Sequence, residues 1–199
     1  LFEYVTGSLT DVTFDVFAAE DIKAADGVSK DYYKADEKVG TITTDSNGIA
    51  QMDNLPAGKY YVKEVKTAHG YVLDGEPRYV DLSYRDQDTP VITYDEKWQN
   101  TRQKVKVTVL KKEKDTDRVL AGGVFGLYTS EDIKNVNGDV LLEKDSLIEQ
   151  KATDEKGQIT FAADLPVDGK YYVKENSAPD GFVTTEEVQE FTFEYAGED

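Results

Sequence analysis

The side chains on which most enzymes rely are scarce in this sequence of 199 residues. It has a single histidine, His69, and no cysteine, which excludes thiol chemistry, disulfides and thiolate metal sites. No nucleophile elbow and no metal-spaced cluster of ligands occurs. The 40 acidic residues could include a carboxylate pair for glycoside hydrolysis, but no motif singles one out. We therefore expect no turnover of a substrate, no cofactor and no bound metal.

Lys111 is the basic residue with the most unusual position. It continues the phase of Val105, Val107 and Val109 in the segment KVKVTVLK. Because side chains alternate between the two faces of a strand, Lys111 should point into the apolar core. A solvated lysine at the end of a strand is the alternative, and phase alone leaves both open.

Two glutamates and one asparagine complete the set of candidate site residues. Glu64 and Glu175 each end a KYYVKE segment, in phase with its first tyrosine and its valine, so each should lie on the apolar side of its strand. A rim carboxylate is the alternative, because charged residues are rarely buried without a partner. Asn100 ends the segment TYDEKWQN, a candidate last strand of the first half, although a turn or cap residue has the same appearance.

Composition describes a folded, acidic protein. The hydrophobic fraction is 39%, with 13 Tyr and 8 Phe, which is enough to build compact cores. The net charge of −17 would repel phosphate groups, so nucleic acid and anionic membrane surfaces are poor candidates as partners, and we expect no nucleic acid among them. No apolar stretch reaches the roughly 18 residues of a membrane helix. We therefore expect no membrane insertion in this segment.

An internal repeat organises the chain. Matching residues and segments lie 111 positions apart: Phe14 and Phe125, the two EDIK segments that start at Glu20 and Glu131, the two KYYVKE segments that start at Lys59 and Lys170, Gly70 and Gly181, and Tyr84 and Tyr195. Two copies indicate two domains. The short polar segment NTRQK places their boundary near Arg102, so we predict domains over residues 1–102 and 103–199.

Each copy has the periodicity of β-strands. Segments such as KVKVTVLK, YVDLSY and EFTFEY alternate apolar and polar residues, and turn signals such as SNG, PAG, EKG and DG separate them at short intervals. These features predict an all-β protein of two tandem antiparallel β-sandwiches. For the EDIK segments that start at Glu20 and Glu131, together with the residues after each, we expect a short helical turn.

These segments, in this order, resemble the Cna protein B-type (SpaA-like, prealbumin-like) repeat of Gram-positive surface adhesins and pilins. The second copy offers LKKEKDTDRVLAGGVFGLY, TDEKG, LPVDGKYYVKE and APDGF, and the first offers GSLTDVTFDVF, TDSNG, LPAGKYYVKE and AHGYV. The first copy departs from the pattern at Ala68, where the family has proline. The resemblance implies an Ig-like or prealbumin-like sandwich in an extracellular, cell-wall-anchored protein.

The resemblance also implies a chemistry for the candidate residues. Many domains of this family contain an isopeptide bond that forms by itself between a lysine on the first strand and an asparagine on the last, assisted by a buried glutamate. On this pattern Lys111 and Asn100 are cross-link residues, and Glu64 and Glu175 assist. Burial favours the neutral amine of a lysine, which can attack an amide, and the protonated form of a carboxyl group, which can polarise that amide.

The repeat offset implies that each domain keeps only half of its cross-linking residues. Shifted back by the offset, Lys111 would fall immediately before Leu1, and shifted forward, Asn100 would fall beyond Asp199. We therefore expect domain 1 to lack its first strand and domain 2 to lack its last. The partners of Lys111 and Asn100 would then lie outside the chain.

Two functions are compatible with these observations. The first is a non-enzymatic stalk or spacer of a surface adhesin or pilin, whose partners are neighbouring repeats of the same protein. The alternative is an adhesin module that binds a host protein or a glycan through the loops at residues 24–39 and 135–148, which differ between the copies. Trp98 and the tyrosines are interpreted as packing residues rather than a sugar platform.

The incomplete set of cross-linking residues in each domain generates a prediction. Because neither domain contains both cross-link partners, the intact mass of this 199-residue chain should equal the mass of its sequence. An extended chain that includes both flanking strands should be lighter by about 17 Da per completed domain, because amide exchange expels ammonia. Mass spectrometry measures both, and the same loss from the unextended chain would contradict the prediction.

Overall fold

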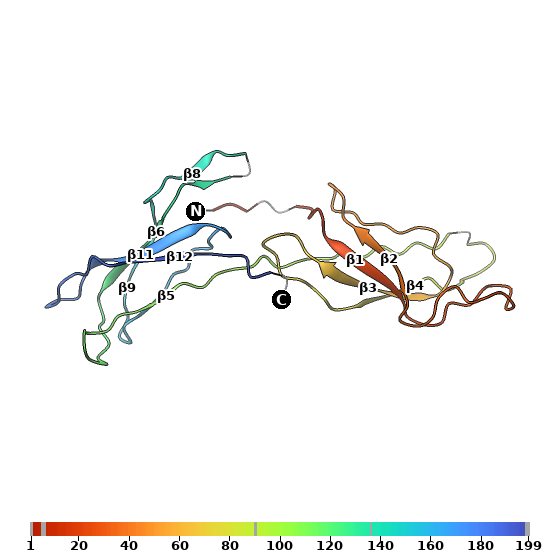
Figure 1. Cartoon of the computed structure of the whole chain (residues 1–199), viewed down its shortest axis with the longest axis horizontal. Helices are drawn as coiled ribbons and strands as arrows, with labels where there is room; N and C mark the ends of the chain where they lie inside the picture. Colours follow the sequence, from red (N-terminus) through yellow and green to blue (C-terminus); the bar gives the residue numbers. More distant parts are fainter. Residues whose placement is uncertain (1, 5–6, 90, 136, 198–199) are drawn as a thin grey trace. The chain divides into compact units, whose positions relative to one another are not determined.

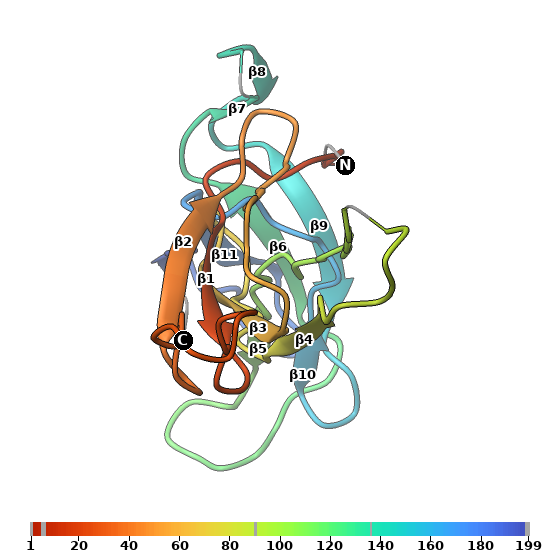
Figure 2. The same ribbon diagram turned by 90° about the vertical axis from the view of Figure 1, so that its right-hand side faces the viewer.

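The computed structural model describes residues 2–4, 7–89, 91–135 and 137–197, and Figures 1 and 2 show its strands. The chain forms two compact units. We call Val5–Arg102 with Ala196–Asp199 the first module, and Gln103–Tyr195 with Leu1–Tyr4 the second module. The main boundary between the two modules therefore lies between Arg102 and Gln103.

The division into modules differs from the sequence-based domains at the two ends. The second module includes residues 1–4, which the sequence placed in the first domain. Phe2 packs against the core of the second module, and the hydroxyl of Tyr4 donates to the backbone carbonyl of Asp164 at 2.7 Å. The predicted domain ends, Leu1 and Asp199, lie outside the described residues.

The first module is built on one antiparallel sheet of order β2-β1-β3-β4. Its strands are β1 (Thr13–Ala18), β2 (Lys38–Thr43), β3 (Lys59–Lys66) and β4 (Arg78–Asp81). Strand β1 alternates buried and half-buried side chains along its whole length, as a strand with one face on the core should. The core contains Val16, Ala18, Ile22 and Tyr60.

The second module repeats this sheet and adds two strand pairs. The repeated sheet has the order β12-β11-β6-β9, with β6 (Val124–Thr129), β9 (Leu147–Ala152), β11 (Lys170–Ser177) and β12 (Val188–Thr192). The added pairs are β5 (Thr108–Leu110) with β10 (Gln158–Thr160), and β7 (Ile133–Lys134) with β8 (Val140–Leu142). The core residues come from both sheets and the segments between them: Phe125, Leu127, Ile133, Ile159, Phe161, Leu165, Tyr171, Val173 and Phe193.

The predicted fold class is confirmed. In the part of the chain that the structure describes, no helix occurs, every strand pair is antiparallel, and no sheet contains strands of both modules. The buried residues also form two separate clusters, one in each module. Each copy of the repeat therefore has its own core.

The predicted helical turn at the two EDIK segments is wrong. In the second module Ile133 and Lys134 form strand β7 and pair with β8. In the first module Ile22 forms a bridge with Tyr33, and its carbonyl accepts a hydrogen bond from the backbone N–H of Tyr32 at 2.8 Å. Both isoleucines are buried, so an extended backbone that places them in the core prevails over a local turn.

A buried tyrosine anchors the central strand of each module. Tyr60 on β3 and Tyr171 on β11 are 1% and 0% exposed. Their hydroxyls donate to the backbone carbonyls of Pro56 and Pro166 in the preceding turns. Burial raises the pKa of Tyr60 to about 12 and raises that of Tyr171 as well. These anchors fix the phase of the strands that carry Glu64 and Glu175.

The separate cores generate a prediction. Leu127 on β6 is fully buried, so Leu127→Ala should remove about 3 kcal/mol from the unfolding free energy of the second module. Hydrogen exchange should then quicken in β6 and β11 and stay unchanged in β1 and β3. The matched control is Leu147→Ala, because Leu147 is 47% exposed. Equal acceleration in both modules would contradict separate cores.

Candidate functional site

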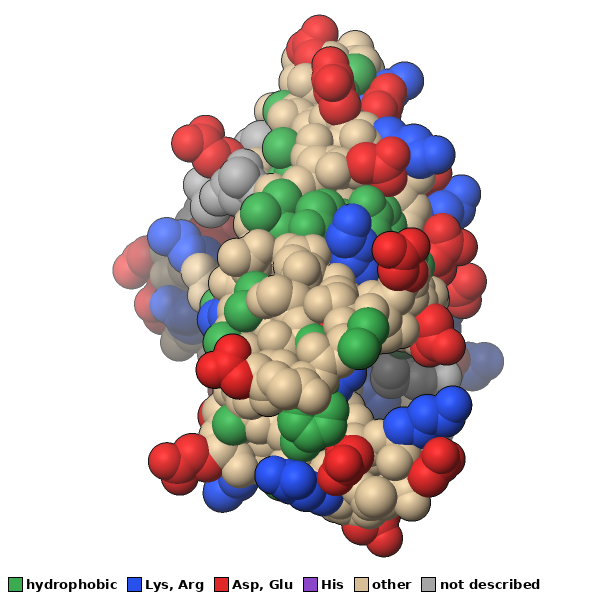
Figure 3. Space-filling view, turned by 90° about the vertical axis from the view of Figure 1, so that its left-hand side faces the viewer, with side chains coloured by type: hydrophobic (Ala, Val, Ile, Leu, Met, Phe, Trp, Pro, Cys, Tyr) green, Lys and Arg blue, Asp and Glu red, His purple; other side chains and the backbone are tan. Residues whose placement is uncertain are grey.

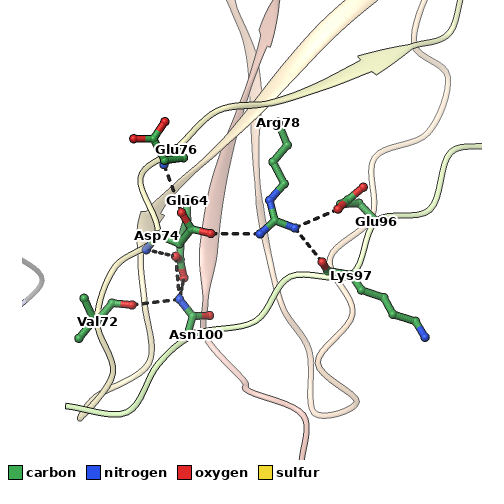
Figure 4. Close-up of polar contacts among 8 residues, drawn as sticks. All are labelled: Glu64, Val72, Asp74, Glu76, Arg78, Glu96, Lys97 and Asn100. Atoms are coloured by element: carbon green, nitrogen blue, oxygen red, sulfur yellow. Dashed lines mark hydrogen bonds and ion pairs between the residues drawn. The ribbon is translucent and has the colours of Figure 1, made fainter. Parts of the chain in front are cut away.

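The buried carboxyl group of Glu64 is the centre of the polar cluster in the first module. It lies on β3 opposite Phe14 of β1, and the residue is 1% exposed. The backbone N–H of Asp74 donates to its Oε2 at 2.7 Å. Nδ2 of Asn100 lies 2.8 Å from both carboxyl oxygens and donates to them (Figure 4). The structure thus places two of the predicted site residues, Glu64 and Asn100, in direct contact.

Backbone contacts hold Asn100 at this position. The residue after it, Thr101, accepts a hydrogen bond from the backbone N–H of Val72 at 2.8 Å, and Arg102 forms a bridge with Tyr71. Nδ2 of Asn100 also reaches the carbonyl of Val72 at 3.2 Å. The predicted strand over residues 93–100 does not form, because no described neighbour offers that segment a ladder of backbone hydrogen bonds.

Arg78 on β4 fixes the segment that leads to Asn100. Its guanidinium donates to Glu96 at 2.9 Å and to the carbonyl of Lys97 at 2.7 Å, and it pairs with Asp74 at 3.1 Å (Figure 4). The hydroxyl of Tyr94 and the guanidinium of Arg78 together hold the pKa of Glu96 below its ordinary value.

Trp98 packs between this arginine and the core. Its ring lies 3.9 Å from the guanidinium carbon of Arg78 and meets the ring of Phe14 edge-on at 4.9 Å between centroids. These contacts are a cation–π interaction on one side and core packing on the other. The role of Arg78 was not predicted from the sequence. The signal available was the oppositely charged Asp74 four positions earlier.

The second module has a matching carboxyl group with a different partner. Glu175 on β11 is 3% exposed, and its Oε2 accepts the backbone N–H of Thr185 at 2.8 Å. Nζ of Lys111 lies 3.0 Å from Oε1. The contact is a close ion pair between the partly buried ammonium and the buried carboxyl group.

Strand β5, which directly precedes Lys111, directs the side chain of Lys111 inward. Val105, Val107 and Val109 pack against the core of the second module, and β5 pairs with β10. The backbone N–H of Lys111 donates to the carbonyl of Gly157 at 2.8 Å, which continues this pairing beyond the strand. The lysine side chain is 18% exposed, against 44% for the neighbouring Lys112. Its stem is therefore buried and its ammonium is directed at Glu175.

The two buried glutamates share one contact and differ in the other. Asp74 and Thr185 are equivalent positions in the repeat, so each buried glutamate accepts the same backbone N–H. The second contact of the carboxyl group is the side-chain amide of Asn100 in the first module and the ammonium of Lys111 in the second. The structure therefore brings together two pairs, one in each module, and Lys111 and Asn100 belong to different modules.

The two loops proposed as ligand sites each border a surface hollow. One hollow of about 480 Å³ is lined by residues 29–34 and Glu37. The other, of about 330 Å³, is lined partly by Lys144 and Asp145 from the second loop, with Tyr172 and Glu190 beside them. Acidic and basic side chains are interspersed on the face shown in Figure 3. Such a mixture does not form the single-sign basic surface that nucleic acid requires.

Within the described ranges, no group of three or more histidine, cysteine or acidic residues is placed to hold a metal ion. The same residues include no helix long and apolar enough to cross a membrane.

The comparisons with known proteins agree with this architecture. The sequence model described as SpaA, prealbumin-like fold domain, matches residues 3–98 and 105–199. The Bacillus anthracis TIE protein is similar in structure, with a TM-score of 0.60 and 27% identity, over 96% of this chain and 30% of that protein. The chain therefore spans less than a third of that protein's length.

Pilins also appear among the similar structures. The shaft pilin SpaA of Lactobacillus rhamnosus GG has a TM-score of 0.33 and 17% identity over 94% of this chain and 85% of its own. A streptococcal ancillary pilin has a TM-score of 0.32 and 25% identity over 92% of this chain and 54% of its own. No curated protein matches the sequence.

The ion pair of the second module generates a prediction. Lys111→Ala leaves Glu175 buried without a cation, which should lower the unfolding free energy of the module by about 3 kcal/mol. Lys112→Ala is the control, because its exposed pair with Asp117 should contribute less than about 1 kcal/mol. Urea denaturation followed by circular dichroism measures both variants.

The double variant Lys111→Met with Glu175→Gln tests the cause. It replaces both charges by neutral groups of similar size, so it should recover most of the stability that Lys111→Ala loses. If Lys111→Ala and Lys112→Ala cost the same, the ion pair contributes nothing and the interpretation is wrong.

Proposed function

Because the chain belongs to the SpaA family of prealbumin-like fold domains, we propose that it is a structural spacer of a bacterial cell-surface protein or pilus, in which buried residues form isopeptide cross-links. The observation that carries the proposal is the buried glutamate of each module with one cross-link residue beside it. Asn100 contacts Glu64, and Lys111 contacts Glu175. A single self-processing reaction is proposed, with no turnover of a substrate.

The proposed reaction joins a lysine and an asparagine side chain. The neutral amine attacks Cγ of the asparagine, a new Cγ–N bond to the lysine forms, the Cγ–Nδ2 bond breaks and ammonia leaves. The glutamate carries a proton from the attacking amine to the departing nitrogen. The geometry at Glu64 supports this role, because the atom that would leave, Nδ2 of Asn100, lies 2.8 Å from both carboxyl oxygens.

The apolar surroundings support the same chemistry. Phe14 pairs with Glu64 across β1 and β3, and Phe125 pairs with Glu175 across β6 and β11. Removal of water from the site leaves the reacting groups without competing hydrogen bonds from solvent. It also strengthens the electrostatic stabilisation of the charge that develops on the amide oxygen.

A cross-link of this kind suits a stalk. It would join the first strand of a module to the end of its last segment, so a pull on the chain would load covalent bonds rather than hydrogen bonds. It would also stabilise the fold by restricting the unfolded chain, as a disulfide does. The sequence has no cysteine, so disulfides cannot supply this stability.

The setting and partners of the protein follow from this function. We place it outside the cell, in a cell-wall-anchored surface protein of a Gram-positive bacterium, with neighbouring repeats of the same protein as its partners. The net charge of −17 favours solubility where many copies are crowded together.

A second candidate function is adhesion. One hollow is lined by residues 29–34 and Glu37 of the first loop, and the other is lined in part by Lys144 and Asp145 of the second. A host protein or glycan would bind there. An array of glycans and host proteins tests this. Saturable binding that disappears when the loop 24–39 is exchanged for 135–148 would favour adhesion over a pure spacer.

The cross-linking proposal predicts the result of a simple extension. Addition of the segment Gln103–Lys111 directly before Leu1 places a lysine where the repeat offset requires one for the first module. The extended chain should be lighter than its sequence by about 17 Da, with a peptide that joins the added lysine to Asn100. Intact mass and peptide mapping measure this.

Matched variants of the extended chain identify the groups involved. Alanine at the added lysine, or Asn100→Ala, should abolish the mass loss because a reacting atom is absent. Glu64→Gln keeps the shape of the side chain but cannot carry the proton, so it should leave the mass unchanged as well. A full-length mass in the extended wild-type chain, with the module folded, would refute the cross-linking proposal.

A further inference from the structure

A pair of stacked aromatic rings lies on the outer face of the main sheet in each module. In the first module Phe17 on β1 pairs with Tyr61 on β3, and their ring centroids are 5.0 Å apart. In the second module Tyr128 on β6 pairs with Tyr172 on β11, and their ring centroids are also 5.0 Å apart. The repeat therefore places the same stack on both sheets.

The two modules differ on the next strand of this face. In the first module Tyr79 on β4 lies beside the stack, with its ring 5.6 Å from that of Tyr61. The equivalent strand of the second module is β12, next to β11 (Figure 1), and there Glu190 pairs with Tyr172. A carboxylate therefore takes the place of a ring. Tyr79 is 68% exposed, so the repeat leaves this face of the sheet accessible.

A hollow of about 330 Å³ lies beside Tyr172 in the second module. Tyr172 and Glu190 line it but Tyr128 does not, so the hollow borders the side of the Tyr172 ring that faces away from the stack. The polar residues that also line it are Ser130, Lys144, Asp145 and Lys174. Its volume is at the lower end of the range of about 300–1,000 Å³ that is typical of small-molecule sites.

The tyrosine and the aspartate of this hollow are held in place by the fold. The hydroxyl of Tyr172 donates to Oδ1 of Asp145 at 3.2 Å, and the backbone N–H of Asp145 donates to the carbonyl of Thr129 at 2.9 Å. Burial and the hydrogen bond to Asp145 raise the pKa of Tyr172, which keeps the phenol protonated as a donor. Tyr61 and Asp36 form the same hydrogen bond in the first module, also at 3.2 Å. This scaffold is therefore common to both copies.

Three residues of the wall differ from their equivalents in the first module, and each adds a charge or a hydroxyl group. They are Ser130, Lys144 and Glu190, in place of Ala19, Ala35 and Tyr79. Oγ of Ser130 is buried and has no hydrogen-bond partner among the described residues. A buried hydroxyl without a partner is unfavourable, so the wall retains unused capacity for hydrogen bonds.

The charges of the wall indicate the kind of ligand that fits. Two carboxylates, Asp145 and Glu190, are balanced by the ammonium groups of Lys144 and Lys174. An anionic ligand would meet the carboxylates, a cationic ligand would meet the ammonium groups, and an apolar ligand would leave all four charges without hydrogen bonds. A neutral ligand with several hydroxyl groups suits both signs, because a hydroxyl donates to a carboxylate and accepts from an ammonium.

We propose that the hollow beside Tyr172 binds one pyranose ring of a neutral glycan. The C–H face of the sugar lies on the free face of the Tyr172 ring, which is the negative side of its quadrupole. The sugar hydroxyls donate to Glu190 and Asp145 and accept from Lys144 and Lys174. Tyr172 thus packs on Tyr128 with one face and binds the sugar with the other.

This proposal deepens the adhesion candidate and rests on it, because it names the ligand class of one of the two hollows. It is independent of the cross-linking chemistry.

The experiment uses the full chain on an array of oligosaccharides. Neutral oligosaccharides of glucose, galactose, mannose and N-acetylglucosamine stand beside sialylated ones and beside oligomers of unacetylated glucosamine, which are cationic. Saturable binding should occur to neutral glycans and should be at least about tenfold weaker to the charged ones. Isothermal titration with the strongest neutral glycan then gives the dissociation constant and one site per chain.

Glu190→Tyr is the decisive variant, because it installs the residue that the first module has at this position. The new ring should occupy the hollow beside Tyr172 and weaken binding at least about tenfold. The fold should be retained, since Tyr79 occupies the equivalent position of the first module, and circular dichroism checks this. The matched control is Glu187→Tyr, at an exposed position that does not line the hollow, and it should bind as the wild type does.

Variants of the tyrosine test the stacking directly. Tyr172→Phe keeps the ring and removes only the hydroxyl, so it should bind within about threefold of the wild type. Tyr172→Ala removes the stacking surface and should bind at least about tenfold more weakly. Equal affinity of these two variants would overturn the role of the ring.

The outcomes separate this proposal from the adhesion candidate. Binding of neutral glycans that Glu190→Tyr removes and Glu187→Tyr keeps supports both. Preference for charged glycans, or unchanged binding by Glu190→Tyr, overturns the assignment of a neutral pyranose to this hollow. Binding of host proteins on the same array without any glycan binding overturns the pyranose site and leaves adhesion intact, whereas absence of both overturns both.

Discussion

A buried carboxyl group in each module is the constraint on which the rest of the structure depends. Glu64 and Glu175 are almost fully enclosed, and a carboxyl group in an apolar core must be neutral, hydrogen-bonded or paired with a cation. Each receives a backbone N–H from the segment that follows its strand. The strand register, the anchoring tyrosines and the fold of that following segment all serve to place these donors.

The second contact of each carboxyl group reveals how the module is closed. In the second module the partner is Lys111, which arrives on β5 with valines that also seal the core. In the first module the partner is Asn100. A backbone hydrogen bond from Val72 holds the residue after it, Thr101, and Arg78 donates to the carbonyl of Lys97 in the preceding segment. Apolar closure and charge compensation are therefore linked, because one strand supplies both. In the first module Glu64 accepts hydrogen bonds from the backbone N–H of Asp74 and from the side-chain amide of Asn100.

Much of this could be predicted from the sequence, because two periodicities carry it. The offset of 111 residues identified the two copies, and the alternation of apolar and polar residues identified the strands and the inward phase of Lys111 and of both glutamates. These signals are local in the sequence or recur at a fixed offset. Burial of alternate side chains is a direct consequence of strand geometry. The failed helical turn at EDIK shows the limit, since only the core could show that Ile22 and Ile133 are needed inside.

Tertiary structure alone decided the partners. The sequence predicts a strand over residues 93–100. A strand forms only where another segment offers its backbone for hydrogen bonds, and pairing between segments far apart in the sequence has no local signature. The contacts of Arg78 with Glu96 and Trp98 and the packing of Phe2 in the second module depend on which distant segments meet. The sequence therefore determined which side chains face inward, and the fold determined which of them touch.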